Sequence, residues 1–257
     1  MIDVEQLIDD TLTICAIPAP TGQEQARARY LYEQLRGLQG LDVWTDAVGN
    51  LVARVRGAPP ATHDAAAATL VAAHLDTVFG DGVEPRPTRV GQVLRGPGIG
   101  DNALAVATLL TVARTLAGQR LDHDLILAGT VGEEGLGNLR GIRALLDAHA
   151  AAQVLALEGH GVDALVRQAV GSVRLAVTFS GPGGHSWRDR GAPSAVHALA
   201  RAAARVAEEV PATFPGCAAN VGVFHGGSGV NVIAAHAELQ LDLRALEPDT
   251  LQAGEAL

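Results

Sequence analysis

Apolar stretches of strand length alternate with segments of helical periodicity in the first half of the chain. The central stretch is Leu70 to Phe79, which begins as a buried-strand pattern and carries His74 and Asp76 near its C-terminal edge. Alternation of this kind is typical of a parallel sheet with crossover helices. In chain order we predict a helix at 4–14, a helix at 22–38, strands at 41–45 and 50–55, the strand from 70, a helix at 102–116, a strand at 125–130, a helix at 139–149 and a strand at 154–157.

Two local signals refine this pattern. Thr21, with Glu24 three residues later, resembles a capping box and marks the start of the second helix. The segment 80–100 is rich in glycine and proline, which predicts a surface loop.

The pattern changes after Gly161. An alternating stretch at 169–180 predicts a long, half-exposed strand. We therefore predict two domains, residues 1–167 and residues 168–257, the second of α+β character. The other elements predicted in the second domain are a helix at 193–210, strands at 218–224 and 237–244, and the start of a helix at 248–251.

Composition limits the classes of function. The formal net charge of −9 disfavours nucleic acid or an anionic membrane surface as a partner, because both need a basic face. The acidic N-terminus lacks the features of a secretory signal, and no segment has the apolar length of a membrane span, so we expect a cytoplasmic protein. Cys15 and Cys217 fit no metal-binding spacing and are interpreted as structural or incidental thiols of a reducing compartment.

Acidic and imidazole side chains recur where the predicted strands end or helices begin. Each has a plain structural interpretation: a strand-end histidine, a helix cap at Asp101 or a solvated loop acid. Together they are harder to explain, because like charges converging on one crevice raise each other's pKa and divalent cations would remove that penalty. The set is His74, Asp76, Asp101, Glu133, Glu134 and Glu158.

This chemistry predicts a dinuclear hydrolytic site. Such a site needs oxygen and nitrogen ligands, one of them shared by two metal ions, and one acid free to take a proton from the attacking water. Two consecutive glutamates can supply one ligand and one base.

The ordered motifs AHLDTV, GDN, GEEG, LEG, SGPGGHS, GVNVI and LDLR resemble those of the M20 metallopeptidases. This family contains co-catalytic zinc exopeptidases and amidohydrolases. The resemblance implies an α/β fold with a mixed, mainly parallel sheet and flanking helices, plus an inserted α+β lid that serves for dimerisation. A homodimer, a bound pair of zinc ions (or manganese or cobalt) and a small peptide or N-acyl amino acid substrate follow from it.

The resemblance also assigns roles in the first domain. His74 and Glu158 would bind one zinc, Glu134 the other, and Asp101 would bridge both. Glu133 would act as general base and Asp76 would orient His74.

In the second domain, His185 matches a histidine that reaches the active site of the partner copy and polarises the scissile carbonyl; the alternative is a structural loop residue. Asn231 and Arg244 match positions that hold the substrate's carboxylate or backbone, for which a guanidinium fork is suited. A charge on an exposed strand face is the alternative for Arg244.

The family's last zinc-binding histidine has no counterpart before Leu257, so we expect a C-terminally truncated lineage member with an incomplete lid. The predicted activity is hydrolysis of a peptide or N-acyl amide bond beside a free carboxylate. Two alternatives remain: a catalytically impaired binding or dimerisation module, and a different two-zinc aminopeptidase, against which the GPGGHSW insert argues. The substrate itself is left open.

Overall fold

The computed structural model describes residues 2–58, 68–80, 82–159, 161 and 164–256. The chain divides into two compact units, residues 1–162 and residues 163–257. Each is described here by itself.

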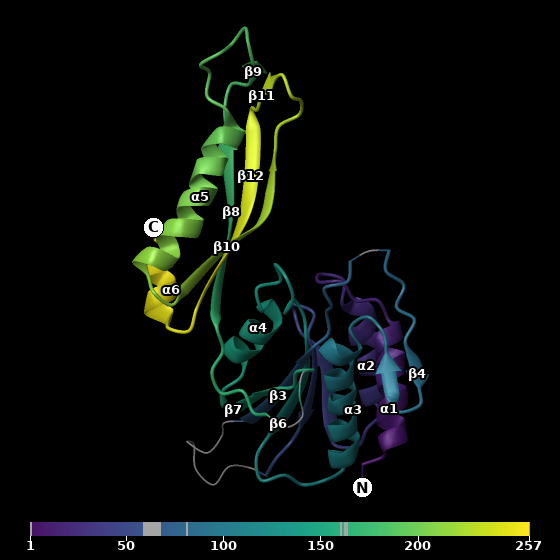
Figure 1. Ribbon diagram of the computed structural model, residues 1–257. Helices are drawn as coiled ribbons and strands as arrows, with labels where there is room; N and C mark the ends of the chain where they lie inside the picture. The colour runs from purple at the N-terminus through teal and green to yellow at the C-terminus, as the bar shows by residue number, and fades with distance from the viewer. Residues whose placement is uncertain (1, 59–67, 81, 160, 162–163, 257) are drawn as a thin grey trace. The chain divides into compact units, whose positions relative to one another are not determined.

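The first unit is built on a five-stranded sheet of order β1-β2-β6-β3-β7. Figure 1 labels β3, β6 and β7 of this sheet. β3 pairs in parallel with both β6 and β7, whereas β2 pairs antiparallel with β1 and with β6. The mixed sheet predicted from the sequence is confirmed. The strands are β1 (Leu41–Thr45), β2 (Leu51–Val55), β3 (Ala68–His74), β6 (Leu125–Thr130) and β7 (Ala151–Ala156).

Helices cover both faces of this sheet. Along β6, Leu127 packs with residues of three helices, while its neighbours Ile126 and Ala128 pack with Leu145 of a fourth, because successive strand residues point to opposite faces. The core is built largely of alanine, valine and leucine, which allows helix and sheet to approach closely. The three helices are α1 (Val4–Ala16), α2 (Gln25–Leu35) and α3 (Leu104–Leu116), and the fourth is α4 (Arg140–Ala148).

The structure corrects two local predictions. Segment 80–100 contains a short hairpin of β4 (Thr88–Val90) and β5 (Val93–Arg95), which its glycine and proline content concealed. The capping-box interpretation is wrong. Glu24 precedes α2 without a side-chain cap bond, and the Thr21 hydroxyl donates to Asp76 Oδ2 at 3.0 Å instead.

The second unit contains a three-stranded antiparallel sheet of order β10-β12-β8. β8 alternates between half-buried and exposed residues, as the sequence predicts, and β12 alternates mostly between buried and half-buried ones. α5 (Ala195–Thr213) packs on it through Leu199. Beyond one end of the sheet, the two short strands β9 and β11 pair with each other (Figure 1). The other elements are β8 (Gly171–Ser180), β9 (Gly184–His185), β10 (Cys217–Gly226), β11 (Val232–Ile233), β12 (His236–Ala245) and α6 (Pro248–Glu255).

None of the described helices has both the length and the apolar character required to cross a lipid bilayer.

Candidate metal centre

The centre begins at the carboxyl end of β3. His74 is the last residue of this strand, and Leu75 continues its pairing by donating its amide to Thr130 O at 2.7 Å. Ligands of open α/β sheets bind outside the carboxyl ends of the strands. His74 is 3% exposed, so its imidazole lies within the protein at that edge.

Two carboxylates from separate elements meet at the imidazole of His74. His74 Nε2 lies 2.9 Å from Asp101 Oδ1 and 3.5 Å from Glu158 Oε1. Asp101 lies in the irregular turn η2 (Ile99–Ala103) that precedes α3, and Glu158 follows the end of β7. The structure therefore brings together three of the four predicted metal ligands in one group.

Close backbone approach allows this meeting. Asn102 Nδ2 donates to Leu157 O at 3.1 Å and ties the turn to the end of β7. The backbone of Gly159 contacts Gly100 so closely that any Cβ at position 159 would overlap the Gly100 carbonyl. Glycine is required there because no other residue leaves room for the two segments to touch.

The double glutamate approaches from β6. One ligand atom each from His74, Glu133 and Glu134 falls within 4.8 Å of the other two, and the same holds for His74, Asp101 and Glu158. The two groups share the imidazole. The predicted fourth ligand, Glu134, and the predicted base, Glu133, thus lie beside the same histidine, and distance alone does not distinguish their roles.

Asp76 contacts both His74 and the double glutamate. Its backbone carbonyl lies 3.0 Å from His74 Nδ1, whereas its carboxylate oxygen is 3.6 Å from that nitrogen. The carboxylate accepts instead the amides of Glu133 at 3.1 Å and Glu134 at 2.9 Å. Asp76 therefore orients His74 chiefly through its main chain and the double glutamate through its side chain.

Charge is concentrated in this group. Burial favours neutral His74, but the carboxylates of Asp76, Glu158 and Glu133 outweigh it and raise the histidine pKa to about 11. Burial, together with neighbouring carboxylates, raises the pKa of Glu133 and of Glu134. The pKa of Asp76 moves the other way: despite burial, the hydrogen bonds it accepts lower it to about 2.

This set of donors fits divalent cations. Asp101 Oδ1 is buried and forms an ion pair with His74 Nε2 at 2.9 Å, but it accepts no hydrogen bond from the described residues. A buried carboxylate oxygen needs a cation or a donor beside it, and a bound metal ion would supply the positive charge in place of the imidazole proton. Imidazole nitrogen with several carboxylate oxygens suits zinc, and also manganese.

His185 and Asn231 of the second unit lie together. His185, in β9, pairs with Val232 of β11, and Asn231 O accepts the amide of Ser186 at 2.9 Å. His185 Nδ1 accepts the amide of Trp187 at 3.2 Å. In the neutral imidazole the proton then resides on Nε2, which makes that atom a hydrogen-bond donor.

Arg244 lies elsewhere in the second unit. It pairs in register with Ser172 on β8, while His236 of the same strand pairs with Ser180 near β9. Eight residues of β12 separate His236 from Arg244, which is about 27 Å of strand. Arg244 ion-pairs with Asp242 at 2.7 Å. Within one copy of this unit, Arg244 and His185 are therefore at opposite ends of the sheet.

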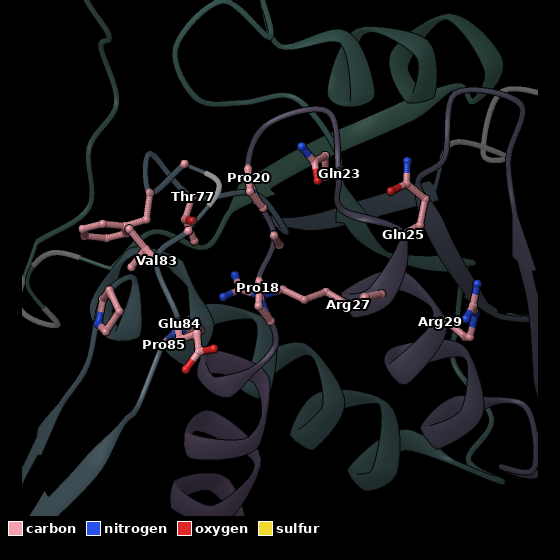
Figure 2. Close-up of a pocket in the computed structure, with 16 residues that line it drawn as sticks. Pro18, Pro20, Gln23, Gln25, Arg27, Arg29, Thr77, Val83, Glu84 and Pro85 are labelled. Atoms are coloured by element: carbon pink, nitrogen blue, oxygen red, sulfur yellow. The ribbon is translucent and has the colours of Figure 1, made fainter.

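Two cavities of about 560 Å³ each lie in the first unit. Figure 2 shows the first, whose lining includes Pro18, Pro20 and the extended side chain of Arg27; no predicted site residue lines it. The second is lined by Phe79, Leu136 and the predicted metal ligand Glu134. The second cavity is therefore the one that adjoins the candidate chemistry.

Comparison with known proteins gives two family matches. The profile of the peptidase dimerisation domain of M20 enzymes matches residues 168–256, and that of peptidase family M28 matches residues 50–211. The two overlap on residues 168–211. The dimerisation match begins close to the division at residues 162 and 163, so it describes the second unit better.

A curated relative, succinyl-diaminopimelate desuccinylase of Corynebacterium glutamicum, is 31% identical over 205 residues, which is 77% of this chain. The chain spans about half (53%) of that relative's length.

Solved structures share the fold. A tripeptidase of Staphylococcus aureus aligns with a TM-score of 0.74 and 23% identity over 99% of this chain and 69% of the other. Aminopeptidase PepT of Bacillus cereus aligns with a TM-score of 0.68 and 22% identity over 99% of this chain and 70% of the other.

Proposed function

The chain belongs to the M20 metallopeptidases, and from that premise we propose that it hydrolyses a peptide or N-acyl amide bond in a small substrate that carries a free carboxylate. The observation that carries the proposal is the convergence of His74, Asp101 and Glu158 with the double glutamate at one sheet edge. Four elements that are distant in sequence supply these groups. A solvated acidic surface would not require such distant elements to converge.

His74, Asp101, Glu134 and Glu158 would hold two divalent cations, zinc or alternatively manganese or cobalt. When bound, these ions would polarise the scissile carbonyl and acidify a water molecule. Asp101 Oδ1 is buried, accepts no hydrogen bond from the described residues and lies 2.9 Å from His74 Nε2, which supports Asp101 as a metal ligand.

Glu133 would serve as general base and then as general acid. It would take the proton from the attacking water at a carboxylate oxygen and deliver it to the leaving amine. The raised pKa of Glu133 favours these proton transfers, because a carboxylate with a low pKa takes up the proton of water poorly. The Asp76 carboxylate supports the role by fixing the Glu133 amide.

His185 would polarise the carbonyl oxygen of the scissile bond by donating a hydrogen bond from Nε2–H, which keeps its proton. The acceptor contact at Nδ1 supports this tautomer. Asn231 and Arg244 would hold the substrate's backbone or carboxylate. Because His185 and Arg244 lie at opposite ends of one sheet, a small substrate that meets both requires two copies of the chain. The matched dimerisation domain supports such a homodimer.

Zinc removal and Glu133→Gln test this proposal. Dipeptides, tripeptides, N-acyl amino acids and succinyl-diaminopimelate would be supplied to the full chain as substrates. We expect chelation to abolish turnover reversibly, and Glu133→Gln to lower kcat by about 10²- to 10⁴-fold while the zinc content stays unchanged. Glu209→Gln on α5, an exposed acid paired with Arg205, is the matched control and should keep full turnover.

Full turnover by Glu133→Gln would contradict the assigned base. Self-association without turnover of any substrate would instead support a non-catalytic dimerisation module.

A further inference from the structure

Four consecutive amides after β6 are each bound by a buried or partly buried side chain from elsewhere in the chain. Val131 N donates to Asn50 Oδ1 at 3.0 Å, and Gly132 N donates to Glu24 Oε1 at 3.1 Å. The amides of Glu133 and Glu134 donate to the two oxygens of Asp76. The stretch that carries the candidate base and ligand is thus held by three separate segments.

Glu24, like Asn50, is an acceptor that the candidate mechanism does not use, and it is the charged one of the two. It is 1% exposed and precedes α2. Oε1 also accepts the amide of Gly22 at 2.8 Å and Arg140 Nη2 at 2.8 Å. Arg140 is the first residue of α4, so the carboxylate joins the start of α2 to the segment between β6 and α4.

Three donors at one oxygen favour a carboxylate over an amide. An ionised carboxylate forms shorter and stronger hydrogen bonds, and an amide oxygen has no charge with which to balance the guanidinium. Gly132 adopts φ +66°, and a Cβ there would overlap the Arg140 guanidinium. The turn therefore requires a glycine at position 132 and the Arg140 side chain in the position that Glu24 stabilises.

We propose that Glu24, through Gly132 and Arg140, is a positioning residue that sets the double glutamate at the geometry needed for metal binding and proton transfer. The inference rests on the proposed function for its catalytic part. Its metal-binding part depends only on Glu134 being a ligand. Glu24 itself touches neither substrate nor metal.

Glu24→Gln is the direct test, with Asp10→Asn as a matched control. Asp10 is also buried, at 3% exposure, and pairs with Arg114, but it lies on α1. Zinc affinity would be measured by competition with a chromophoric chelator, the free energy of unfolding by urea, and kcat and KM with the best substrate of the panel.

Both substitutions remove a buried charge from an ion pair, so we expect both to lower stability. Only Glu24→Gln should weaken zinc binding, by about 10- to 100-fold, as loss of a residue that orients a ligand does. It should also lower kcat while KM stays within about twofold of the parent value. A zinc affinity equal to that of Asp10→Asn would overturn the proposal.

Arg140→Gln covers the case in which Glu24→Gln does not fold, because the Arg140 side chain is 37% exposed. We expect it to weaken zinc binding in the same direction, by about tenfold. Unchanged zinc affinity would overturn the proposal. A parent chain that binds zinc but hydrolyses nothing would refute the proposed function alone, since zinc affinity tests Glu24 independently.

Discussion

The candidate residues of the two units are held by contacts of very different sequence separation. In the first unit, the amides of Glu133 and Glu134 bind Asp76 across 57 and 58 residues, and Gly132 binds Glu24 across 108. In the second unit, His185 accepts from Trp187, two residues away, and Arg244 pairs with Asp242, also two residues away.

The candidate site of the first unit is formed by the fold, whereas the candidate residues of the second unit lie on its surface. The geometry of the first unit's centre depends on tertiary structure, so it exists only when that unit is folded. The backbones of His185 and Arg244 are held by strand pairing, but their side chains are exposed and bond to residues two positions away, so their chemistry depends on what docks against them. We therefore expect substitutions in the two units to affect different measurements.

Leu199→Ala should give the largest effect and should remain confined to the second unit. Leu199 is fully buried between α5 and the sheet, and its truncation should cost about 2–5 kcal/mol in the free energy of unfolding of that unit. Hydrogen exchange would locate the loss, and zinc titration of the same protein should match the parent. His197→Ala, exposed on the same helix, is the control. A parallel loss of zinc affinity would show that the metal centre depends on the second unit.

His185→Asn should come next, with an effect on turnover alone. The asparagine side chain can still accept hydrogen bonds from the amides that bind Nδ1, but the substitution removes the Nε2 donor. We expect kcat to fall by about 10²-fold, which is the effect of losing one oxyanion donor. The free energy of unfolding should stay within about 0.5 kcal/mol of the parent value. His225→Ala, an exposed histidine of β10, should change neither quantity. Unaltered kcat in His185→Asn would leave His185 as a structural loop residue.

Gly159→Ala should give the smallest effect, on metal affinity. The added methyl group forces the segment that carries Glu158 away from Gly100, so the Glu158 and Asp101 carboxylates separate. We expect zinc affinity to fall by about tenfold in a chelator competition. Gly37→Ala, whose Cβ would meet open space, is the control. Equal zinc affinity in both variants would mean that the close contact between Gly159 and Gly100 does not determine the geometry of the site.

Most elements of the fold could be predicted because their sequence patterns are local. β1 and β6 have the bounds that their apolar runs predict, and α3 and β12 begin within two residues of theirs. The β4–β5 hairpin could not be predicted, since short strands separated by glycine and proline have no distinct periodicity.

The candidate site was predictable to the extent that its residues end strands. His74 and Glu158 follow this rule, and His74 and Asp101 are close in space as the motifs imply. The supporting residues were not predictable. Glu24 matches a helix-start pattern, yet its partner Gly132 is 108 residues away, and no local signal reports such a distance.

Chain length, as well as shape, is constrained between Val131 and Glu134. Because each amide there has its own acceptor, one inserted or deleted residue would move every later donor to the wrong partner. At the turn of the β4–β5 hairpin, a Cβ added to Gly91 would meet open space, and the Gly91 carbonyl accepts a hydrogen bond from Arg89, only two residues away. Insertions introduced by engineering should therefore be accepted at Gly91 and rejected after β6, which makes the hairpin the place to attach a reporter without disturbing the metal centre.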